Sequence, residues 1–495
     1  MFLFPVCSPF LTSPSCLSVF PPPEMKGKNP WNTPTTIIIT VIGIIAIVAL
    51  VTVAVLQNRH LPQKYKYGIV LDAGSSHTSV YIYKLCQIYT VGISSYASAP
   101  WKAGESLRAC MQDVEQQVPK KRHRQTPLYL GATAGMRLLK YNSSMSDGVL
   151  QAVEEALQKF PFSYQGARIL SGQEEGAFGW VTVNYLDDRL SQVCGLETTG
   201  ALDLGGASTQ ISFVSDKYNG SESPSNSVNF RLYGNDYNLY THSFLCYGKD
   251  QALLMTQSVP EMLNDPCFNP GYTAIKNYSK IYDSPCLSGW KPQKIPTHFT
   301  HNGTGNFQQC QRIVKSIFNF THCKYSQCSF NGIFQPSLQG QFGAFSAYYF
   351  VMSFLNLTDT TMPLEAVKAK LAHYCSTPWN QIKQQHPEVN EKYLAGYCFS
   401  GTYILTLLME GYNFTSEEYS NIKFIKKIKD SDAGWTLGYM LNLTNMIPAE
   451  APDSPLLPYS GYVSLVTIMA ILLFILFILC LCPLWTRCSK QPEIV

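Results

Sequence analysis

Two similar turns, each built around an aspartate and glycine, constrain the fold of this chain more than any other feature. The first lies in IVLDAGSSHTSVYIYK (residues 69–84), where an apolar run ends on Asp72 and a second β-branched and aromatic run follows. The second lies in GALDLGGASTQISF (residues 200–213), which repeats the pattern around Asp203. A β-hairpin turn accounts for either stretch alone, because Asp, Gly and Ser favour such turns. Two copies in matching strand contexts indicate an internal duplication, with the turns facing each other across a cleft.

These turns also have the composition of a site for phosphate and a cation. Glycine and serine allow backbone N–H groups to approach an anion closely, and a carboxylate beside them can hold a cation. Two such turns on opposite sides of a cleft could clamp a polyphosphate. The hairpin interpretation explains each turn but does not explain why they occur as a pair.

Two stretches between the turns carry further candidate residues. TPLYLGATAGMRLL (residues 126–139) breaks at a glycine and continues as a helix, which places Thr133 at a helix N-terminus within reach of a ligand. An ordinary strand-to-helix connection is the alternative. RILSGQEEGAFGWVTVNY (residues 168–185) sets Glu174 and Glu175 at the end of an apolar strand, where hydrolysis of a phosphoanhydride needs a base for water. Only one of the pair should face the cleft, because adjacent strand residues point to opposite faces, and the alternative is a solvated surface pair.

The composition is that of a folded protein with room for more than one domain. The 495 residues are 46% hydrophobic and 14% charged, with a formal net charge of +4. No basic run or basic and aromatic patch stands out, so nucleic acid is not expected as a partner. The first 24 residues are rich in Pro and Ser and match no structural period, so we expect them to be dispensable, or not made at all if translation starts at Met25.

Two uncharged apolar stretches lie near the ends of the chain, at residues 35–56 and 462–482. Each reaches the ~20 residues that a helix needs to span a bilayer, and the alternative is a buried core helix. We expect two transmembrane helices that enclose a domain at residues 57–461. Cytoplasmic segments would then occupy residues 1–34 and 483–495. Such helices can pack closely through small residues such as Gly43 and Ala46, which would allow homo-oligomers.

Sequons and cysteines indicate that the central segment faces an oxidising compartment outside the cytoplasm. Asn-x-Ser/Thr sequons between the apolar stretches start at Asn142, Asn219, Asn277, Asn302, Asn319, Asn356, Asn413 and Asn442. Eleven cysteines in the same segment are spread along the chain rather than grouped with histidines at zinc spacings, which indicates disulfides. The odd number leaves one over, and Cys194 is the candidate for an unpaired thiol. We therefore expect a multi-pass protein of the plasma membrane with its central domain outside the cell.

Five blocks, read in order along the chain, resemble a known family. The blocks are DAGSSHT, GATAGMR, GQEEGAFGW, DLGGASTQ and GWTLGYMLNLT. In this order, and with an apolar stretch at each end, they resemble the apyrase conserved regions of the ecto-nucleoside triphosphate diphosphohydrolases over nearly all of residues 66–448. YTHSFLCYGKDQAL and YCFSGTYIL are most similar to the cell-surface members. The resemblance implies an α/β fold with two ribonuclease-H-like lobes of the actin, Hsp70 and sugar-kinase type. Lobe I would comprise about residues 67–171 and 426–448, and lobe II about residues 172–425.

The resemblance also implies a reaction and roles for individual residues. It implies removal of the γ and then the β phosphate of extracellular ATP or ADP to give AMP, with Ca²⁺ or Mg²⁺. On this basis Asp72 and Asp203 hold the cation through its waters. Glu175 deprotonates the attacking water, and Ser208 and Gln210 help to place it. The residues implied in phosphate binding are Ser75, Ser76, His77, Thr133, Ala134, Gly205, Gly206 and Ala207. The residues implied at the nucleobase are Phe350, Tyr393 and Tyr397. Trp435 in the last block is a further candidate, although a tryptophan buried in a core is the commoner case.

The resemblance implies five disulfides and leaves two alternative functions open. The pairs would be Cys86 with Cys110, Cys246 with Cys286, Cys267 with Cys310, Cys323 with Cys328, and Cys375 with Cys398. Two segments depart from the family pattern, because LCQIYTV (residues 85–91) replaces a longer acidic segment and DDRLSQVCGLETT (residues 187–199) shortens a loop. One alternative is therefore a nucleotide-binding surface protein with weak or no turnover. The other is a phosphotransferase of the same fold, which would need a sugar or protein acceptor.

Overall fold

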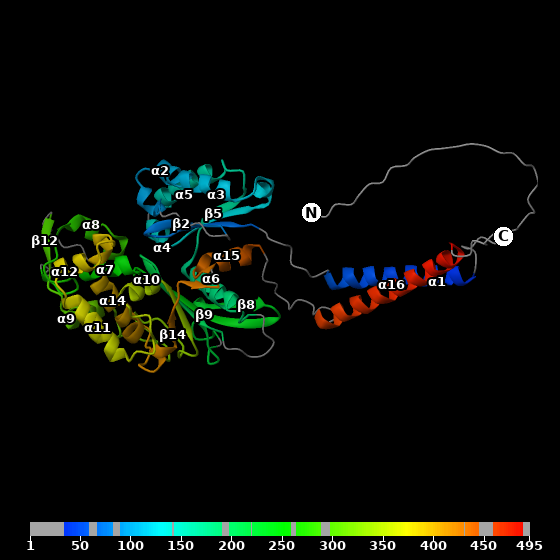
Figure 1. Ribbon diagram of the computed structural model, residues 1–495. Coiled ribbons are helices and arrows are strands. Elements are labelled where there is room, and N and C mark those ends of the chain that lie inside the picture. Colours follow the sequence, from blue (N-terminus) through cyan, green and yellow to red (C-terminus); the bar gives the residue numbers. More distant parts are fainter. Residues whose placement is uncertain are drawn as a thin grey trace, which may run out of the picture. The chain divides into compact units, whose positions relative to one another are not determined.

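The protein divides into two compact units (Figure 1). The computed structural model describes residues 34–58, 67–82, 90–140, 143–190, 198–218, 220–258, 264–288, 298–429, 431–444 and 459–488. One unit combines the two ends of the chain, Met1–Pro62 and Asp453–Val495. The other, Gln63–Pro452, contains both central sheets and every candidate site residue.

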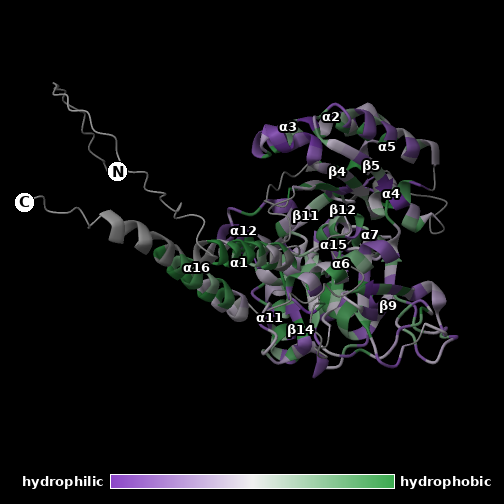
Figure 2. Cartoon of the chain, turned by 90° about the vertical axis from the view of Figure 1, so that its right-hand side faces the viewer, coloured by the Kyte–Doolittle hydropathy of each residue, from purple (hydrophilic) through white to green (hydrophobic). Residues whose placement is uncertain are grey.

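The end unit consists of two helices, α1 (Pro34–Asn58) and α16 (Tyr459–Cys488), which contact each other. They cover the two apolar stretches, and Figure 2 shows α1 and much of α16 as hydrophobic. Large apolar side chains of α1 are exposed, with Ile45 at 63% and Val48 at 59%. Among the residues that the structure describes, no helix combines the length and apolar character required to cross a membrane.

The first central sheet has five strands in the order β3-β2-β1-β4-β5. The strands are β1 (Ile69–Ala73), β2 (His77–Ile82), β3 (Thr90–Val91), β4 (Pro127–Ala132) and β5 (Ser163–Ile169). β1 pairs antiparallel with β2 and parallel with β4, and β4 pairs parallel with β5. The residues of β1 are buried almost throughout, as expected of a central strand covered on both faces.

The second central sheet has six strands in the order β14-β13-β6-β7-β9-β8. The strands are β6 (Gly200–Leu204), β7 (Ser208–Val214), β8 (Ser227–Leu232), β9 (Asn235–Leu245), β13 (Phe342–Ser346) and β14 (Ile422–Phe424). β6 pairs antiparallel with β7 and parallel with β13, and β13 pairs parallel with β14. This arrangement repeats that of β1 with β2, β4 and β5.

The strand registers also repeat between the two sheets. Asp72 of β1 lies opposite Ser79 of β2, and Asp203 of β6 lies opposite Gln210 of β7. Each aspartate is therefore followed by a turn of the same length before its hairpin partner. Both the topology and the register confirm the duplication that the paired turns predicted.

Helices cover the two sheets and complete two apolar cores. The helices are α2 (Trp101–Ser106), α3 (Arg108–Gln117), α4 (Ala134–Leu139), α5 (Ser143–Leu157), α6 (Gly172–Leu186), α7 (Lys249–Gln257), α8 (Tyr278–Tyr282), α9 (Phe307–Ser316), α10 (Ala347–Phe354), α11 (Leu364–Ser376), α12 (Trp379–Gln385), α13 (Glu391–Leu394), α14 (Tyr397–Thr406) and α15 (Trp435–Leu443). α2, α3 and α5 lie together on the first sheet (Figure 1), where Leu71, Met111 and Val153 share one buried cluster. Small sheets are formed by β10 (Asn264–Asp265) with β11 (Thr273–Asn277) and β12 (His298–Gly303), and by β15 (Lys427–Ile428) with β16 (Ser431–Asp432).

The two helices that follow the two sheets, α6 and α15, pack against each other. The Gly438 N–H of α15 donates to the Thr182 hydroxyl of α6 at 2.8 Å. A methyl group at Gly438 would lie 2.2 Å from the Phe178 carbonyl oxygen, so only glycine permits this approach. β1 also contacts α15, which ties the last helix of the domain to its first strand.

Four of the five predicted disulfides are present, and all four lie in the second half of the domain. They are Cys246–Cys286, Cys267–Cys310, Cys323–Cys328 and Cys375–Cys398. Cys86 and Cys194 lie outside the described residues, as do the sequons at Asn142 and Asn219. Of the described sequon asparagines, those exposed are Asn319, Asn356, Asn413 and Asn442.

The neutral state of His242 on β9 predicts an acid-sensitive contribution to stability. Desolvation lowers the pKa of His242 from 6.5 to about 4, and its ring is 2.7 Å from the Asn226 side-chain oxygen. Between these two pH values the unfolded chain binds a proton that the folded protein excludes, so stability falls as the pH is lowered through this window. We expect a smaller loss in His242→Gln, measured as the change in thermal unfolding temperature between pH 7 and pH 5. An equal loss in both proteins would contradict this assignment.

Candidate active site

The two aspartate turns approach each other closely. A methyl group at Gly206 in the second turn would lie 2.4 Å from Ser76 Oγ and 2.8 Å from Ser75 Oγ in the first. Gly205 and Ala207 flank this point, and Ala207 is buried. The backbone of the second turn therefore faces the serine hydroxyls of the first, as the sequence predicts.

Helix α7 supports the second turn from behind. The N–H of Lys249 donates to the Gly205 carbonyl at 2.9 Å, and the N–H of Asp250 donates to the Gly206 carbonyl at 2.9 Å. The Asp250 carboxylate also accepts a hydrogen bond from Ser76 Oγ at 3.1 Å, which joins the two turns directly. Desolvation lowers the pKa of neighbouring His77, and the charge of Asp250 opposes that shift.

Helix α4 begins beside the first turn. Thr133 is the residue before its first turn and is buried, and its N–H donates to the Ala73 carbonyl at 3.1 Å. Ala134 packs in one small cluster with Ala207 of the second turn. A methyl group at Gly135 would lie 2.8 Å from the Ser75 Cα. Thr133 and Ala134 therefore adjoin both turns.

Glu174 and Glu175 lie in the first turn of a helix, so their predicted place at a strand end is wrong. Ser171 caps α6 by accepting from the Glu174 N–H, and the Glu174 carboxylate accepts from the Ser171 N–H. This reciprocal cap begins the helix just before the pair. Glu174 pairs outward with Arg168 at 2.9 Å, whereas Glu175 is only 6% exposed. One carboxylate of the pair faces inward as predicted, because of helical rather than strand geometry.

Glu175 belongs to a hydrogen-bonded network with Ser208, Gln210 and Arg137. Arg137 Nη2 donates to Glu175 Oε2 at 2.7 Å and to Ser208 Oγ at 2.9 Å. Gln210 Nε2 contacts the same two oxygens at 3.0 and 2.8 Å, and Ser243 Oγ at 2.9 Å. The Gln210 Oε1 atom is buried, and no hydrogen-bond partner for it occurs in the described part of the chain. An acceptor therefore remains beside Glu175 for a small donor such as water.

Three carboxylates interact at the ends of β1, β6 and α6, of which Asp203 and Glu175 are buried and Asp72 is partly buried. Burial raises the pKa of Asp72 well above its ordinary value, and the charges of Glu175 and Asp203 raise it further. Burial raises the pKa of Asp203 to about 7, and the charge of Glu175 adds to the shift. Desolvation is the larger cause for both aspartates, and repulsion between the like charges adds to it. Arg137, bonded to Glu175, supplies a single positive charge against the three.

This arrangement suits a divalent cation held through its own waters. The Asp72 Oδ1 atom is buried, and no partner for it is found among the described residues. A cation between the aspartates would neutralise their repulsion, and its waters would donate to this oxygen. In the described ranges no three His, Cys, Asp or Glu side chains converge closely enough to bind a metal directly. The unpartnered Asp72 oxygen is consistent with the predicted mode of binding, through water.

Two residues outside the turns hold the aspartates in place. Trp435, the first residue of α15, is 3% exposed, and a hydrogen bond from its side chain lowers the pKa of Asp72. A hydrogen bond from Ser346 has the same effect on Asp203. Ser346 ends β13 and precedes α10 with φ of 57°, a conformation that few non-glycine residues adopt.

The three predicted nucleobase residues lie on helices of the second half of the domain. Phe350 of α10 is 50% exposed and Tyr393 of α13 is 61% exposed. Tyr397, the first residue of α14, is half-buried, and its ring stacks on that of Phe354. α10 links the nucleobase residues to the carboxylates, because it carries Phe350 and begins directly after Ser346, which hydrogen-bonds to Asp203.

Four residues of the site were not predicted from the sequence: Arg137, Ser243, Asp250 and Ser346. Arg137 lies in the GATAGMR block four residues after Thr133, and this spacing places both residues on one helical face. That spacing was the available signal. Ser243 and Asp250 lie in YTHSFLCYGKDQAL, which resembles the family, but nothing in that stretch assigns them to the site. Ser346 joins the site through a tertiary contact alone.

Comparison with known proteins agrees with this geometry. Residues 58–455 match the GDA1/CD39 (nucleoside phosphatase) family. The chain is 49% identical over 471 residues to mouse ectonucleoside triphosphate diphosphohydrolase 1, covering 88% of this chain and 92% of that protein. It is 44% identical over 434 residues to mouse ectonucleoside triphosphate diphosphohydrolase 8, covering 80% and 86% respectively.

A solved structure supports the fold. The crystal structure of nucleoside triphosphate hydrolases from Neospora caninum has a TM-score of 0.52 and 18% identity, and covers 76% of this chain and 92% of that one. These relatives are all named as hydrolases, so the comparisons do not support the alternative of a binding protein without turnover. The duplicated sheets, the paired turns and these matches together show that the chain belongs to the GDA1/CD39 nucleoside phosphatase family.

Proposed function

We propose that this protein hydrolyses extracellular nucleoside tri- and diphosphates, releasing phosphate from ATP and ADP until AMP remains. The observation that carries the proposal is the buried network of Glu175, Arg137, Ser208 and Gln210 between two glycine-rich turns. The similarity to nucleoside triphosphate diphosphohydrolases supports the choice of substrate.

In the proposed reaction Glu175 accepts the proton of the attacking water. Arg137 and Gln210 both donate to Glu175 Oε2, which fixes the carboxylate and leaves its Oε1 atom for the water. The second O–H of that water donates a hydrogen bond to the unpartnered Gln210 Oε1. The two hydrogen bonds of the water then point a lone pair of its oxygen toward phosphorus. A base positioned in this way contributes about 10²- to 10⁴-fold to a rate.

The turns bind the phosphates in this proposal. Ser75, Ser76 and His77 approach from the first turn, Gly205, Gly206 and Ala207 approach from the second, and Thr133 and Ala134 lie beside them. Backbone N–H groups and hydroxyls that donate to the phosphate oxygens would stabilise the charge that develops during displacement. When bound, Ca²⁺ or Mg²⁺ would neutralise phosphate charge, held through water by Asp72 and Asp203.

Phosphate release from cells that carry the full-length chain tests the proposal. With Ca²⁺ or Mg²⁺ in the medium we expect release from both ATP and ADP, and we expect EDTA to abolish it. Surface labelling of the same cells confirms that the protein has reached the membrane. A labelled wild type that releases no phosphate from either nucleotide would disprove the proposed hydrolase.

Gly206→Ala is expected to raise the KM for ATP about 10-fold, because the added methyl group fills the space between the turns. That methyl would lie 2.4 Å from Ser76 Oγ and 2.7 Å from Asp250 Oδ2, so these two side chains must move aside and their hydrogen bond is lost. At the neighbouring Gly205, a methyl would meet only the Ser208 carbonyl oxygen, at 3.3 Å. Gly205→Ala should therefore raise KM less, and equal effects in steady-state kinetics would contradict a narrow space at Gly206.

The proposal includes two membrane spans, at residues 35–56 and 462–482, with both termini in the cytoplasm. The absence of charge in each stretch and the sequons between them support this topology. Copies could associate through the spans, since a methyl group at Gly43 would meet no other described atom within 4 Å.

Glycosidase treatment of intact cells should lower the mass of the protein, and an unchanged mass would contradict an extracellular domain. Cross-linking in the membrane tests association.

A further inference from the structure

An aromatic cluster lies behind the nucleobase residues, formed by Phe354, Tyr374, His386 and Tyr397. The rings of Phe354 and Tyr397 stack with centroids 3.7 Å apart and planes 10° apart. Tyr374 meets Phe354 edge-on at 5.9 Å, and His386 is inclined to Phe354 at 4.8 Å. Phe354 is therefore the ring that all three others contact.

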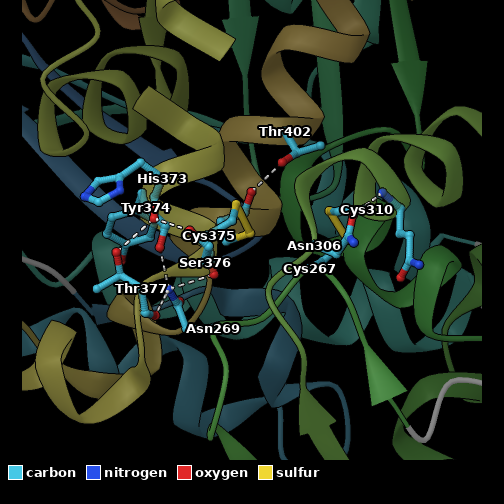
Figure 3. Close-up of a disulfide and its surroundings, with 12 residues drawn as sticks. Cys267, Asn269, Asn306, Cys310, His373, Tyr374, Cys375, Ser376, Thr377 and Thr402 are labelled. Atoms are coloured by element: carbon cyan, nitrogen blue, oxygen red, sulfur yellow. Dashed lines mark hydrogen bonds between the residues drawn. A yellow bond between two sulfur atoms is a disulfide. The ribbon is translucent and has the colours of Figure 1, made fainter. Parts of the chain in front are cut away.

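A disulfide and a hydrogen-bonded turn fix the frame of this cluster. Cys375–Cys398 joins the end of α11 to the start of α14, and each cysteine follows a tyrosine of the cluster. Figure 3 shows the turn after α11, where Asn269 Nδ2 donates to the Tyr374 carbonyl at 2.7 Å and to the Thr377 carbonyl at 3.1 Å. The backbone that carries Tyr374 therefore has little freedom to move.

The same frame extends to α13, the helix that carries Tyr393. The Tyr374 hydroxyl donates to the Leu394 carbonyl of α13 at 3.1 Å, next to the exposed Tyr393. α10 carries both Phe350 and Phe354, which lie about one turn, or about 6 Å, apart along the helix axis. Ser346, the residue before α10, hydrogen-bonds to Asp203, so this helix leads from the carboxylates to the aromatic rings.

We propose that Phe354 is a positioning residue for the nucleobase. It covers one face of the Tyr397 ring and holds that ring in a fixed orientation, and the partly exposed Tyr397 presents its remaining surface to the base. This inference rests on the proposed function. Phe354 does not touch the base, and it acts on base binding only by orienting Tyr397. A leucine at this position fills similar space but cannot stack, so Tyr397 would sample orientations that do not bind the base.

The test compares Phe354→Leu and Phe354→Tyr with the wild type. Phe354→Leu should raise the KM for ATP about 3- to 10-fold, the value of one aromatic pair, with kcat nearly unchanged. Tripolyphosphate, which has no base, should inhibit both proteins with the same inhibition constant. Phe354→Tyr retains a ring and should restore the KM of the wild type. Phe268→Leu is the matched control, because Phe268 stacks on Tyr272 with centroids 5.1 Å apart outside the site.

An unchanged KM in Phe354→Leu would overturn the inference, as would an inhibition constant for tripolyphosphate that rises in parallel with KM. An equal rise of KM in Phe268→Leu would also overturn it, since general loosening would then explain the effect. Calorimetric titration of ADP repeats the comparison without turnover. A wild type that binds ADP but releases no phosphate would contradict only the proposed function, whereas one that binds no ADP would contradict the inference as well.

Discussion

Glu175→Gln is expected to lower kcat for ATP and ADP by about 10²-fold or more while leaving KM close to that of the wild type. The amide oxygen of glutamine can still accept from Arg137 and Gln210, so the network around the site persists. The amide cannot accept a proton from water, and the loss is therefore confined to the chemical step. Phosphate release by the purified variant measures kcat and KM separately.

The adjacent Glu174 offers a matched control for this variant. Glu174 pairs outward with Arg168 and caps α6, and it takes no part in the buried network. Glu174→Gln should therefore retain most of the activity, with at most a small loss of thermal stability. If Glu174→Gln loses as much kcat as Glu175→Gln, disturbance of the start of α6 explains both losses, rather than the removal of a base. If Glu175→Gln keeps more than about a tenth of the kcat, the loss is below that of a general base and Glu175 is not the base.

Asp203→Asn is expected to need about 10- to 100-fold more Ca²⁺ or Mg²⁺ for half-maximal activity, the usual loss when a residue that acts on a metal through its ligands is changed. The reason is the loss of one of two carboxylates that would accept from the waters of the cation. Removing this charge also relieves repulsion with Asp72 and Glu175. In EDTA the variant should therefore unfold at a higher temperature than the wild type.

Thermal unfolding provides a second measurement that does not depend on activity. A cation that binds only the folded protein stabilises it, by about 2.7 kcal/mol at a hundredfold excess over its dissociation constant. We expect added Ca²⁺ or Mg²⁺ to raise the unfolding temperature of the wild type and to have little effect on Asp203→Asn. Asp216→Asn, at an exposed aspartate, is the control. An equal rise in all three proteins would place the cation elsewhere.

The sequence predicted the site where a local pattern was repeated or matched a family block. The turns at Asp72 and Asp203 were predicted because the same residues recur in the same strand context, and the sheets confirm that repeat. The four disulfides now observed were implied only by the resemblance to the family. Spacing along the chain could not have paired them.

The errors and omissions have physical causes. Glu174 and Glu175 were placed at a strand end because the apolar run before them was extended to the pair. The capping box that begins with Ser171 was present in the sequence and would have indicated a helix. Asp250 and Ser346 could not be predicted, because each reaches the site through a contact with a residue distant in the chain.

The packing of the first strand against the last helix affects the order in which the domain can fold during synthesis. Val70 of β1 is fully buried in a cluster with Trp435, Tyr439 and Met440 of α15, and Gly68 lies close against the Met440 side chain. On the ribosome β1 emerges long before α15 has been made, so one side of the strand has no native cover for most of translation. Apolar surface that is exposed in this way promotes misassembly and is bound by chaperones. Folding of the domain is therefore completed only after its C-terminal helix has left the ribosome.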